Sequence, residues 1–85
     1  MKVLYSKKFE KGYKKLDVSI REKFKVRIIL FKEDKFHKLL HNHSVDPPCK
    51  GARSINITGD YRVLYVEPED NVFLFIKIGT HSELY

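Results

Sequence analysis

The hydrophobic pattern changes its period once along this chain, and that change limits the folds open to it. Up to Phe36, apolar residues recur every three to four positions, as they do in amphipathic helices. From Arg53 onward they alternate with polar residues, as in strands that bury one face. A chain with helical segments first and strands afterwards predicts an α+β fold, with the helices packed on one face of a sheet.

Two helical segments are predicted in the first half. Ser6 is placed to cap the first, whose apolar face carries Phe9, Tyr13 and Leu16. Residues 17–19 interrupt the pattern, and Ser19 with Glu22 has the spacing of a capping box for the second helix. The apolar stripe of that helix consists of Ile20, Phe24, Ile28 and Phe31. Because the break is short, the two helices should form an antiparallel hairpin.

The second half predicts the sheet. Segment 36–50 has no period and contains Asp46-Pro47-Pro48, which indicates an irregular connection. Strands are predicted at 53–57, 61–66 and 72–78, with a short β-prone segment at 2–6 and a polar tail at 80–85. The expected order is β-α-α-β-β-β, a helical hairpin on a small, mostly antiparallel sheet, and we expect a single domain over residues 1–85.

Charge and composition restrict the class of function. Seventeen Lys and Arg against eleven Asp and Glu give a net charge of +6, which suits an anionic partner such as nucleic acid. The single cysteine, Cys49, rules out an internal disulfide and indicates a reducing compartment. No apolar run has the length of a membrane span, and no signal segment is evident. We therefore expect a cytoplasmic protein that does not bind membranes.

Several kinds of enzyme lack their signatures here. The glycines form neither a P-loop nor a dinucleotide fingerprint, and there is no G-x-S-x-G motif. Cys49 lies beside two prolines, with no helix N-terminus to activate its thiol. His37 and His41 would face one metal only if the second helix reached them, and their spacing matches no zinc signature. Neither a metal nor another cofactor is expected.

Cationic and titratable side chains are expected to converge at the strand ends. Arg53 begins one strand, Arg62 lies in the next, and His81 and Tyr85 follow the last. Since neighbouring strands lie about 5 Å apart, these side chains can line one groove. Arginine can hold a phosphodiester, histidine can transfer a proton near neutral pH, and tyrosine can stack on a base. The alternative is structural, with the arginines in surface ion pairs and the other two in a solvated tail.

Three motifs give the chain a family resemblance. The segment RSINITGDYRVLY at 53–65 and the segment IGTHSELY at 78–85 resemble the RelE/ParE superfamily of bacterial toxins. The similarity is greatest to its YafQ-type branch, which Leu40-His41-Asn42-His43 also matches. The resemblance implies the toxin of a type II toxin–antitoxin system, a ribosome-dependent and metal-free endoribonuclease. Its expected partners are a cognate antitoxin, mRNA in the ribosomal A site, and rRNA contacted by the lysine-rich hairpin.

The resemblance also implies roles for single residues. The 2′-hydroxyl of mRNA attacks the adjacent phosphate, and His81 would be the general acid that protonates the leaving 5′-oxygen. His43 and Asp60 would assist proton abstraction or hold the active geometry. Arg62 occupies the phosphate-binding position, and Tyr85 occupies that of the terminal aromatic residue. The further residues expected to bind substrate are Lys50, Arg53, Asn56 and Lys77.

The chain departs from the branch at two strand positions. Ser54 and Asn56 stand where a well-studied YafQ-type toxin has an acid and a histidine, and neither titrates near neutral pH. Any base role must therefore fall to His43 or be absent. Two alternatives stay open: a ParE-like inhibitor of DNA gyrase, and a catalytically weak RNA- or ribosome-binding module. His43 and His81 argue against the first, because a gyrase binder needs no proton-transfer groups.

Overall fold

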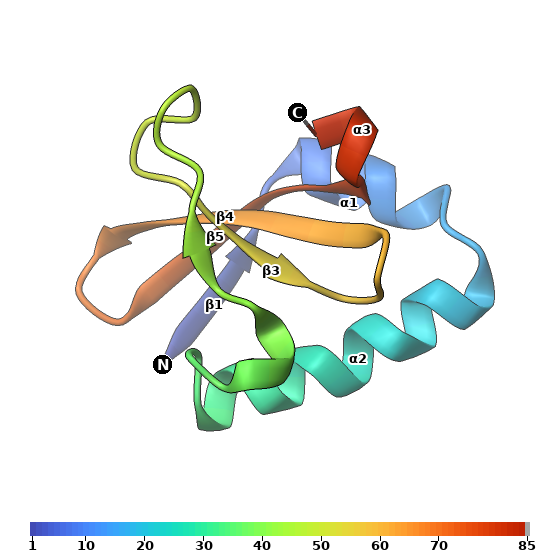
Figure 1. Ribbon diagram of the computed structural model, residues 1–85, viewed down its shortest axis with the longest axis horizontal. Coiled ribbons are helices and arrows are strands. Elements are labelled where there is room, and N and C mark those ends of the chain that lie inside the picture. The colour runs from blue at the N-terminus through green and yellow to red at the C-terminus, as the bar shows by residue number, and fades with distance from the viewer. Residues whose placement is uncertain (85) are drawn as a thin grey trace.

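The structure, a computed structural model, describes residues 1–84 and has the α+β architecture expected from the hydrophobic pattern (Figure 1). Two main helices accompany a five-stranded sheet. The elements in chain order are β1 (Lys2–Tyr5), α1 (Lys7–Lys14), α2 (Val18–Glu33), the 3₁₀ turn η1 (Lys38–Leu40), β2 (His43–Ser44), β3 (Arg53–Asn56), β4 (Tyr61–Glu69), β5 (Val72–Thr80) and α3 (His81–Leu84).

The sheet is mixed, with the strand order β1-β5-β4-β3-β2. The first strand runs parallel to β5, so that Lys2 lies opposite Val72, and the other neighbouring strands are antiparallel. This confirms the mostly antiparallel sheet. The two-residue strand β2 is an addition that periodicity could not reveal, because two residues are too few to show alternation.

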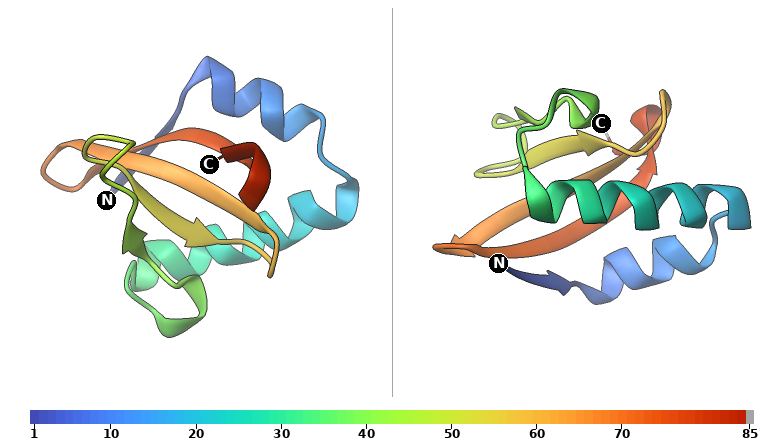
Figure 2. Two further views of the ribbon diagram at one scale, coloured as in Figure 1. Left: turned by 45° about the horizontal axis from the view of Figure 1, so that its top comes forward. Right: turned by 90° about the horizontal axis from the view of Figure 1, so that it is seen from below.

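The helices begin with different caps. As predicted, Ser6 caps α1, and its Oγ accepts a hydrogen bond of 3.0 Å from the amide of Phe9. The capping box predicted from Ser19 and Glu22 is wrong, because Asp17 is the residue that precedes α2. The Ser19 hydroxyl donates to Asp17 Oδ2 at 2.8 Å, and Glu22 pairs with Lys25 instead. The two helices run in opposite directions, as Figure 2 shows.

The main core lies between the helices and one face of the sheet. Phe31 of α2 is fully buried, and its ring centroid lies 5.1, 5.3 and 5.4 Å from those of Tyr65, Phe73 and Phe75. Such edge-to-face pairs add to the free energy gained by burying the rings. Phe9 joins α1 to this core through Phe24 and Phe75. One face of the sheet is therefore closed by helices.

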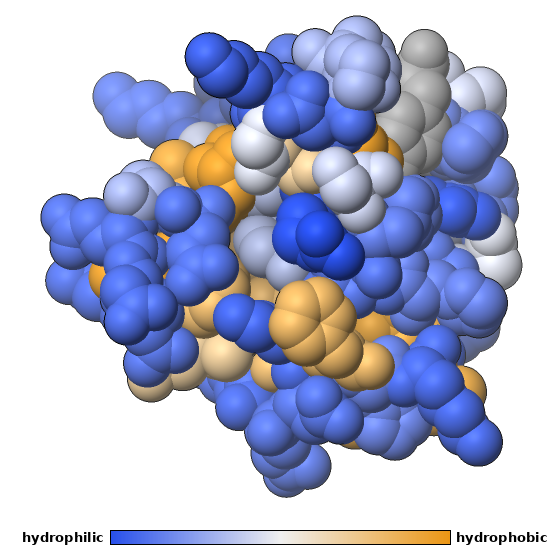
Figure 3. Space-filling model, turned by 60° about the vertical axis from the view of Figure 1, so that its left-hand side comes forward, coloured by the Kyte–Doolittle hydropathy of each residue, from blue (hydrophilic) through white to orange (hydrophobic). Residues whose placement is uncertain are grey.

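The other face of the sheet is covered only in part. A small cluster there consists of Val45, Ala52, Leu64 and Leu84, from the loop after β2, from β4 and from α3. In the left view of Figure 2, α3 lies in front of the sheet and α2 behind it. The surface in Figure 3 is mostly hydrophilic, with apolar side chains in separate patches. Among the helices described, none is long and apolar enough to cross a membrane.

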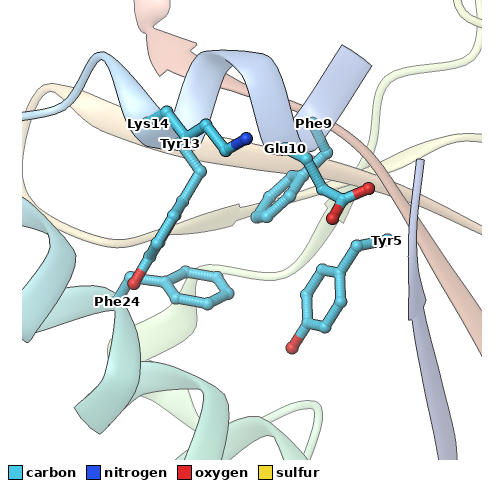
Figure 4. Close-up of a pocket in the computed structure, with 6 residues that line it drawn as sticks. All are labelled: Tyr5, Phe9, Glu10, Tyr13, Lys14 and Phe24. Atoms are coloured by element: carbon cyan, nitrogen blue, oxygen red, sulfur yellow. The ribbon is translucent and has the colours of Figure 1, made fainter. Parts of the chain in front are cut away.

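A hollow of about 300 Å³ lies on the helical side, away from the partly covered face. The rings of Tyr5, Phe9, Tyr13 and Phe24 line it, together with Glu10 and Lys14 at its rim (Figure 4). Burial raises the pKa of Tyr5, the ring that β1 contributes. None of the residues that the sequence singled out for chemistry lines this hollow.

Candidate active site on the open face of the sheet

Strand pairing brings four of the predicted site residues to the face of the sheet opposite α2, here called the open face. In an antiparallel pair, directly opposed residues point to the same side. Asn56 is opposed to Arg62, and Ile55 and Val63, their neighbours in the strands, are buried in the helix-side core. His43 is opposed to Ser54, which has the same parity as Asn56. The open face therefore carries His43, Asn56 and Arg62, and Lys77 joins them through β5.

Lys77 reaches this face because of a bulge in β5. Leu64 is opposed to Lys77, whereas the next residue, Tyr65, is opposed to Phe75. Ile76 is thus the extra residue, and it packs in the small cluster with Leu64 on the open face. Because of the bulge, Ile76 and Lys77 point to the same side, which puts a half-buried lysine on the open face, across from Leu64.

His43 is held in one tautomer by the backbone. Its Nδ1 lies 2.7 Å from the carbonyl oxygen of His41. A carbonyl can only accept a hydrogen bond, so Nδ1 carries the proton when the imidazole is neutral. Nε2 is then the unprotonated nitrogen of an exposed ring, the arrangement that a proton acceptor needs.

Arg53 lies on the opposite side from these residues. Its Nε donates to Asn42 Oδ1 at 2.7 Å, and its guanidinium group is 5.5 Å from the ring centre of Phe36. Asn42 also donates to the hydroxyl of Tyr65 at 2.7 Å, and burial raises the pKa of that phenol. Arg53 thus fixes the residue next to His43, and the fold does not bring its guanidinium group to the open face.

The turn between β3 and β4 meets the start of α3. The amide of His81 donates to the backbone oxygen of Asp60 at 3.0 Å. Arg62 Nη2 donates to the backbone oxygen of Gly59 at 3.2 Å. Since Tyr61 is opposed to Thr80, these bonds gather His81, Asp60 and Arg62 at one end of the sheet. Lys50 is exposed in the loop between β2 and β3, and Tyr85 lies outside the described residues.

The segment predicted as a polar tail is instead a helical turn with its own cap. The amide and hydroxyl of Thr80 donate to Glu83 Oε1 at 2.7 and 2.9 Å, and the Glu83 amide donates back to Thr80 Oγ1 at 3.3 Å. These bonds form a capping box, and they lower the pKa of the Glu83 carboxyl. Leu84 then anchors the turn in the small cluster. The T-x-x-E spacing in the sequence was the signal that could have revealed this turn.

We expect Gly79→Ala to loosen α3 without unfolding the protein. A Cβ at Gly79 would lie 3.0 Å from Glu83 Oε1, so the carboxylate would have to shift by a few tenths of an ångström and the bonds of the capping box would weaken. Amide hydrogen exchange should become faster at residues 81–84 and stay unchanged in β4 and β5. Gly59→Ala is the matched control, because nothing lies within 4 Å of the added carbon. Unchanged exchange in α3 of the Gly79 variant would contradict the role given to the box.

The capping box should also depend on pH. Hydrogen bonds to Thr80 lower the pKa of Glu83 in the folded protein, so their stabilising effect is present above the pKa of the unfolded chain. The effect is lost as the pH falls through the lowered folded pKa. We expect the Thr80 amide resonance to move in a pH titration by NMR with a midpoint below the usual range of a glutamate. In Glu83→Gln this transition should be missing. A midpoint within the usual range of a glutamate in the unsubstituted protein would refute the hydrogen bonds assigned to Glu83.

Three buried polar atoms on the open face have no hydrogen-bond partner in the structure. They are Ser54 Oγ, Asn56 Oδ1 and Arg62 Nε. The sequence marks Ser54 only as a departure from a family pattern, and Asn56 both as such a departure and as a residue expected to bind substrate. The strand register adds that all three residues lie on one face, with Asn56 directly across from Arg62.

The described part of the chain has no group of three side chains suited to hold a metal ion. The second helix ends at Glu33, so His37 and His41 do not share a helix. His37 Nδ1 accepts a hydrogen bond of 3.1 Å from the amide of Leu39 at the start of η1. This histidine has a structural role as a cap.

A helical layer on one face of a small sheet is a fold that this chain shares with several solved toxin structures. YafQ from E. coli strain BL21(DE3) is similar with a TM-score of 0.81 and 22% identity, over 98% of this chain and 96% of that chain. A YoeB/ParE toxin from Agrobacterium tumefaciens is similar with a TM-score of 0.77 and 21% identity, over 95% of this chain and 99% of that chain. The E. coli DinJ–YafQ complex is similar with a TM-score of 0.75 and 23% identity, over 98% of this chain and 96% of that chain.

The family model for YafQ, described as a bacterial toxin of type II toxin–antitoxin systems, matches residues 1–85. The chain therefore belongs to the YafQ family of toxins, and the family expected from the two C-terminal motifs is confirmed. None of the curated protein sequences compared with this chain matches it.

Proposed function

We propose that this toxin is a ribosome-dependent endoribonuclease that cleaves mRNA without needing a metal ion. The observation that carries the proposal is that His43, Arg62 and Lys77 lie on one face of the sheet, with the backbone of His81 bonded to that of Asp60 at its end. In the neutral imidazole of His43, the contact of Nδ1 with a carbonyl leaves Nε2 as the proton acceptor. An acid, a base and positive charge are the groups that phosphodiester cleavage by an internal hydroxyl requires.

The proposed reaction uses the 2′-hydroxyl of the mRNA as nucleophile. His43 Nε2 takes the hydroxyl proton, and the 2′-oxygen forms a bond to the adjacent phosphorus. The bond from phosphorus to the 5′-oxygen breaks as the imidazolium of His81 donates its proton to that oxygen. The products are a 2′,3′-cyclic phosphate and a 5′-hydroxyl, and each proton transfer contributes roughly a 10²- to 10⁴-fold acceleration.

The remaining candidate residues would act on binding and geometry. Arg62 and Lys77 would neutralise the charge that grows on the phosphate, and Asp60 would orient His81 from the neighbouring turn. Lys50 would bind the backbone of the RNA, and Tyr85 would stack on a base. Arg53 would act indirectly, since its hydrogen bond to Asn42 supports the backbone that leads into His43.

The proposed partners are an antitoxin, mRNA and the ribosome, in the cytoplasm. The solved E. coli complex of YafQ with DinJ supports a cognate antitoxin for this chain as well. Lys7, Lys8, Lys11, Lys14 and Lys15 are all exposed on or just after α1. Such a row of lysines suits contact with rRNA phosphates. We further propose that residues 1–85 fold as a single toxin domain.

A cell-free translation reaction tests this function. A defined mRNA is incubated with the toxin, with and without ribosomes, and the new 5′ ends are mapped by primer extension. Cuts that appear only when ribosomes are present support the proposal. Translation that stops without cuts would favour a ribosome-binding module instead. No effect on translation, together with inhibited supercoiling by DNA gyrase, would favour the ParE-like alternative.

A further inference from the structure

Two of the unpaired atoms on the open face form a matched donor and acceptor. Asn56 Oδ1 is an acceptor, Arg62 Nε carries a donor hydrogen, and the two residues are directly opposed across β3 and β4. Opposed side chains in a sheet have Cβ atoms about 5 Å apart. Arg62 is already held by its bond to the backbone oxygen of Gly59. The pair is therefore fixed in place but not satisfied.

Unpaired polar atoms of this kind are costly, and folded proteins contain few of them. A buried donor or acceptor left without a partner destabilises the folded protein, because it has lost its hydrogen bonds to water. Both residues are only half-buried, so part of each side chain is exposed on the open face. A ligand that supplies the missing partners would recover this free energy.

The chemistry of the pair restricts what the ligand can be. A phosphate oxygen can accept from Arg62 Nε but has no hydrogen to donate to Asn56 Oδ1. A hydroxyl group can donate to Oδ1 and accept from Nε–H at the same time. In a nucleic acid strand, the group that does both is the ribose 2′-hydroxyl, which DNA lacks.

We infer that Asn56 and Arg62 bind a ribose 2′-hydroxyl of a nucleotide next to the one that is cleaved, and so select RNA over DNA. The inference rests on the proposed function, which puts RNA on this face. The hydroxyl cannot be the attacking one, because the proton of that group must go to His43 and not to Asn56. Asn56 is thus a positioning residue that holds the RNA strand. A titratable residue at the same position would instead exchange protons.

The test is a binding experiment in which single 2′-hydroxyls are removed in turn. Short RNA oligonucleotides, each with one 2′-deoxy or 2′-fluoro nucleotide, are titrated against the toxin in the His81→Ala background, so that no strand is cut. At one position next to the cleaved bond, either change should weaken binding about tenfold, because neither group can donate to Asn56. In Asn56→Leu the same changes should have no effect at that position.

Two control variants separate this contact from a general loss of structure. Asn56→Asp keeps an acceptor at the same place and should keep the sensitivity to 2′-deoxy nucleotides. Asn71→Gly removes an asparagine from the hairpin between β4 and β5, where φ is 63° and glycine is tolerated, and should bind as the parent does. Asn56→Leu should be as stable as the parent in thermal unfolding, since the atom it removes has no partner.

Sensitivity that persists in Asn56→Leu would overturn the inference, and so would equal binding of all 2′-substituted strands by the parent. A dependence on base identity that disappears in Asn56→Leu, without any 2′-deoxy effect, would assign the pair to a base edge and reject the hydroxyl. These results are separate from the cleavage assay. If 2′-selective binding needs Asn56 but translation reactions show no cuts, the contact stands and the nuclease function fails.

Discussion

Replacing His81 with alanine is expected to slow mRNA cleavage by a factor of about 10² to 10⁴. The proposed acid is exposed at the start of α3, where Thr80, Glu83 and Leu84 hold the turn. Without a proton donor the 5′-oxygen must leave as an alkoxide, which is the slow route. Primer extension on a time course of the translation reaction gives the rate.

The matched control for this variant is Ser82→Ala, which changes the next exposed residue of the same turn. It should cleave at the wild-type rate. Both variants should unfold at the same temperature as the wild type, because neither side chain belongs to the core. A His81 variant that still cleaves at the wild-type rate would remove this residue from the mechanism. If the variant unfolds at a lower temperature, its loss of cleavage gives no support to a role of His81 in proton transfer.

Phe31→Ala should have the largest effect on stability. This ring is fully buried at the centre of the core, with the rings of Tyr65, Phe73 and Phe75 around it. Truncation of a buried phenylalanine costs about 3–5 kcal/mol through lost burial and the cavity that remains. Domains of this kind have a total free energy of unfolding of about 5–15 kcal/mol. The variant should therefore unfold at a much lower urea concentration.

Ile29→Ala on the same helix provides the comparison for Phe31. Ile29 is 59% exposed, and its truncation should change the free energy of unfolding by no more than about 0.5 kcal/mol. Phe31→Leu should lose less than Phe31→Ala, because it fills part of the same space. Similar urea midpoints for Phe31→Ala and Ile29→Ala would show that the ring cluster does not hold α2 on the sheet.

The elements that the sequence predicted well are those whose signals are local. Ser6, the stripe through Phe24 and Phe31, and the alternation after Arg53 each lie within a few residues of the structure they specify. The start of α2 was misplaced because two residues with capping side chains, Asp17 and Ser19, lie close together, and the spacing of Glu22 favoured the wrong one. Rules that use only neighbouring residues cannot decide which of Asp17 and Ser19 caps the helix.

The site was harder to predict, because side-chain direction depends on pairing between strands. One groove is expected to hold Arg53 and Arg62 because both lie near strand ends. The register pairs Arg53 with Tyr65 and Asn56 with Arg62, so the two arginines point to opposite faces. The bulge at Ile76, which turns Lys77 to the open face, depends on how β5 pairs with β4 and leaves no mark in the sequence of β5. The unpaired atoms of Asn56 and Arg62 likewise follow from the register.

The parallel pairing of β1 with β5 has a consequence for the order of events during synthesis. Lys2 of β1 can pair only after Val72 has been synthesised, about 70 residues later. At the usual elongation rate of translation, that segment takes roughly 3 to 14 seconds to synthesise. Until then the first strand has no neighbour, and the apolar stripe of α2 has no sheet to cover. Asp60, Arg62 and His81 are made late in this interval, so a nascent copy can assemble the proposed catalytic face only near the end of its own translation. The proposed catalytic face is thus incomplete for most of the time that a nascent copy spends attached to its ribosome.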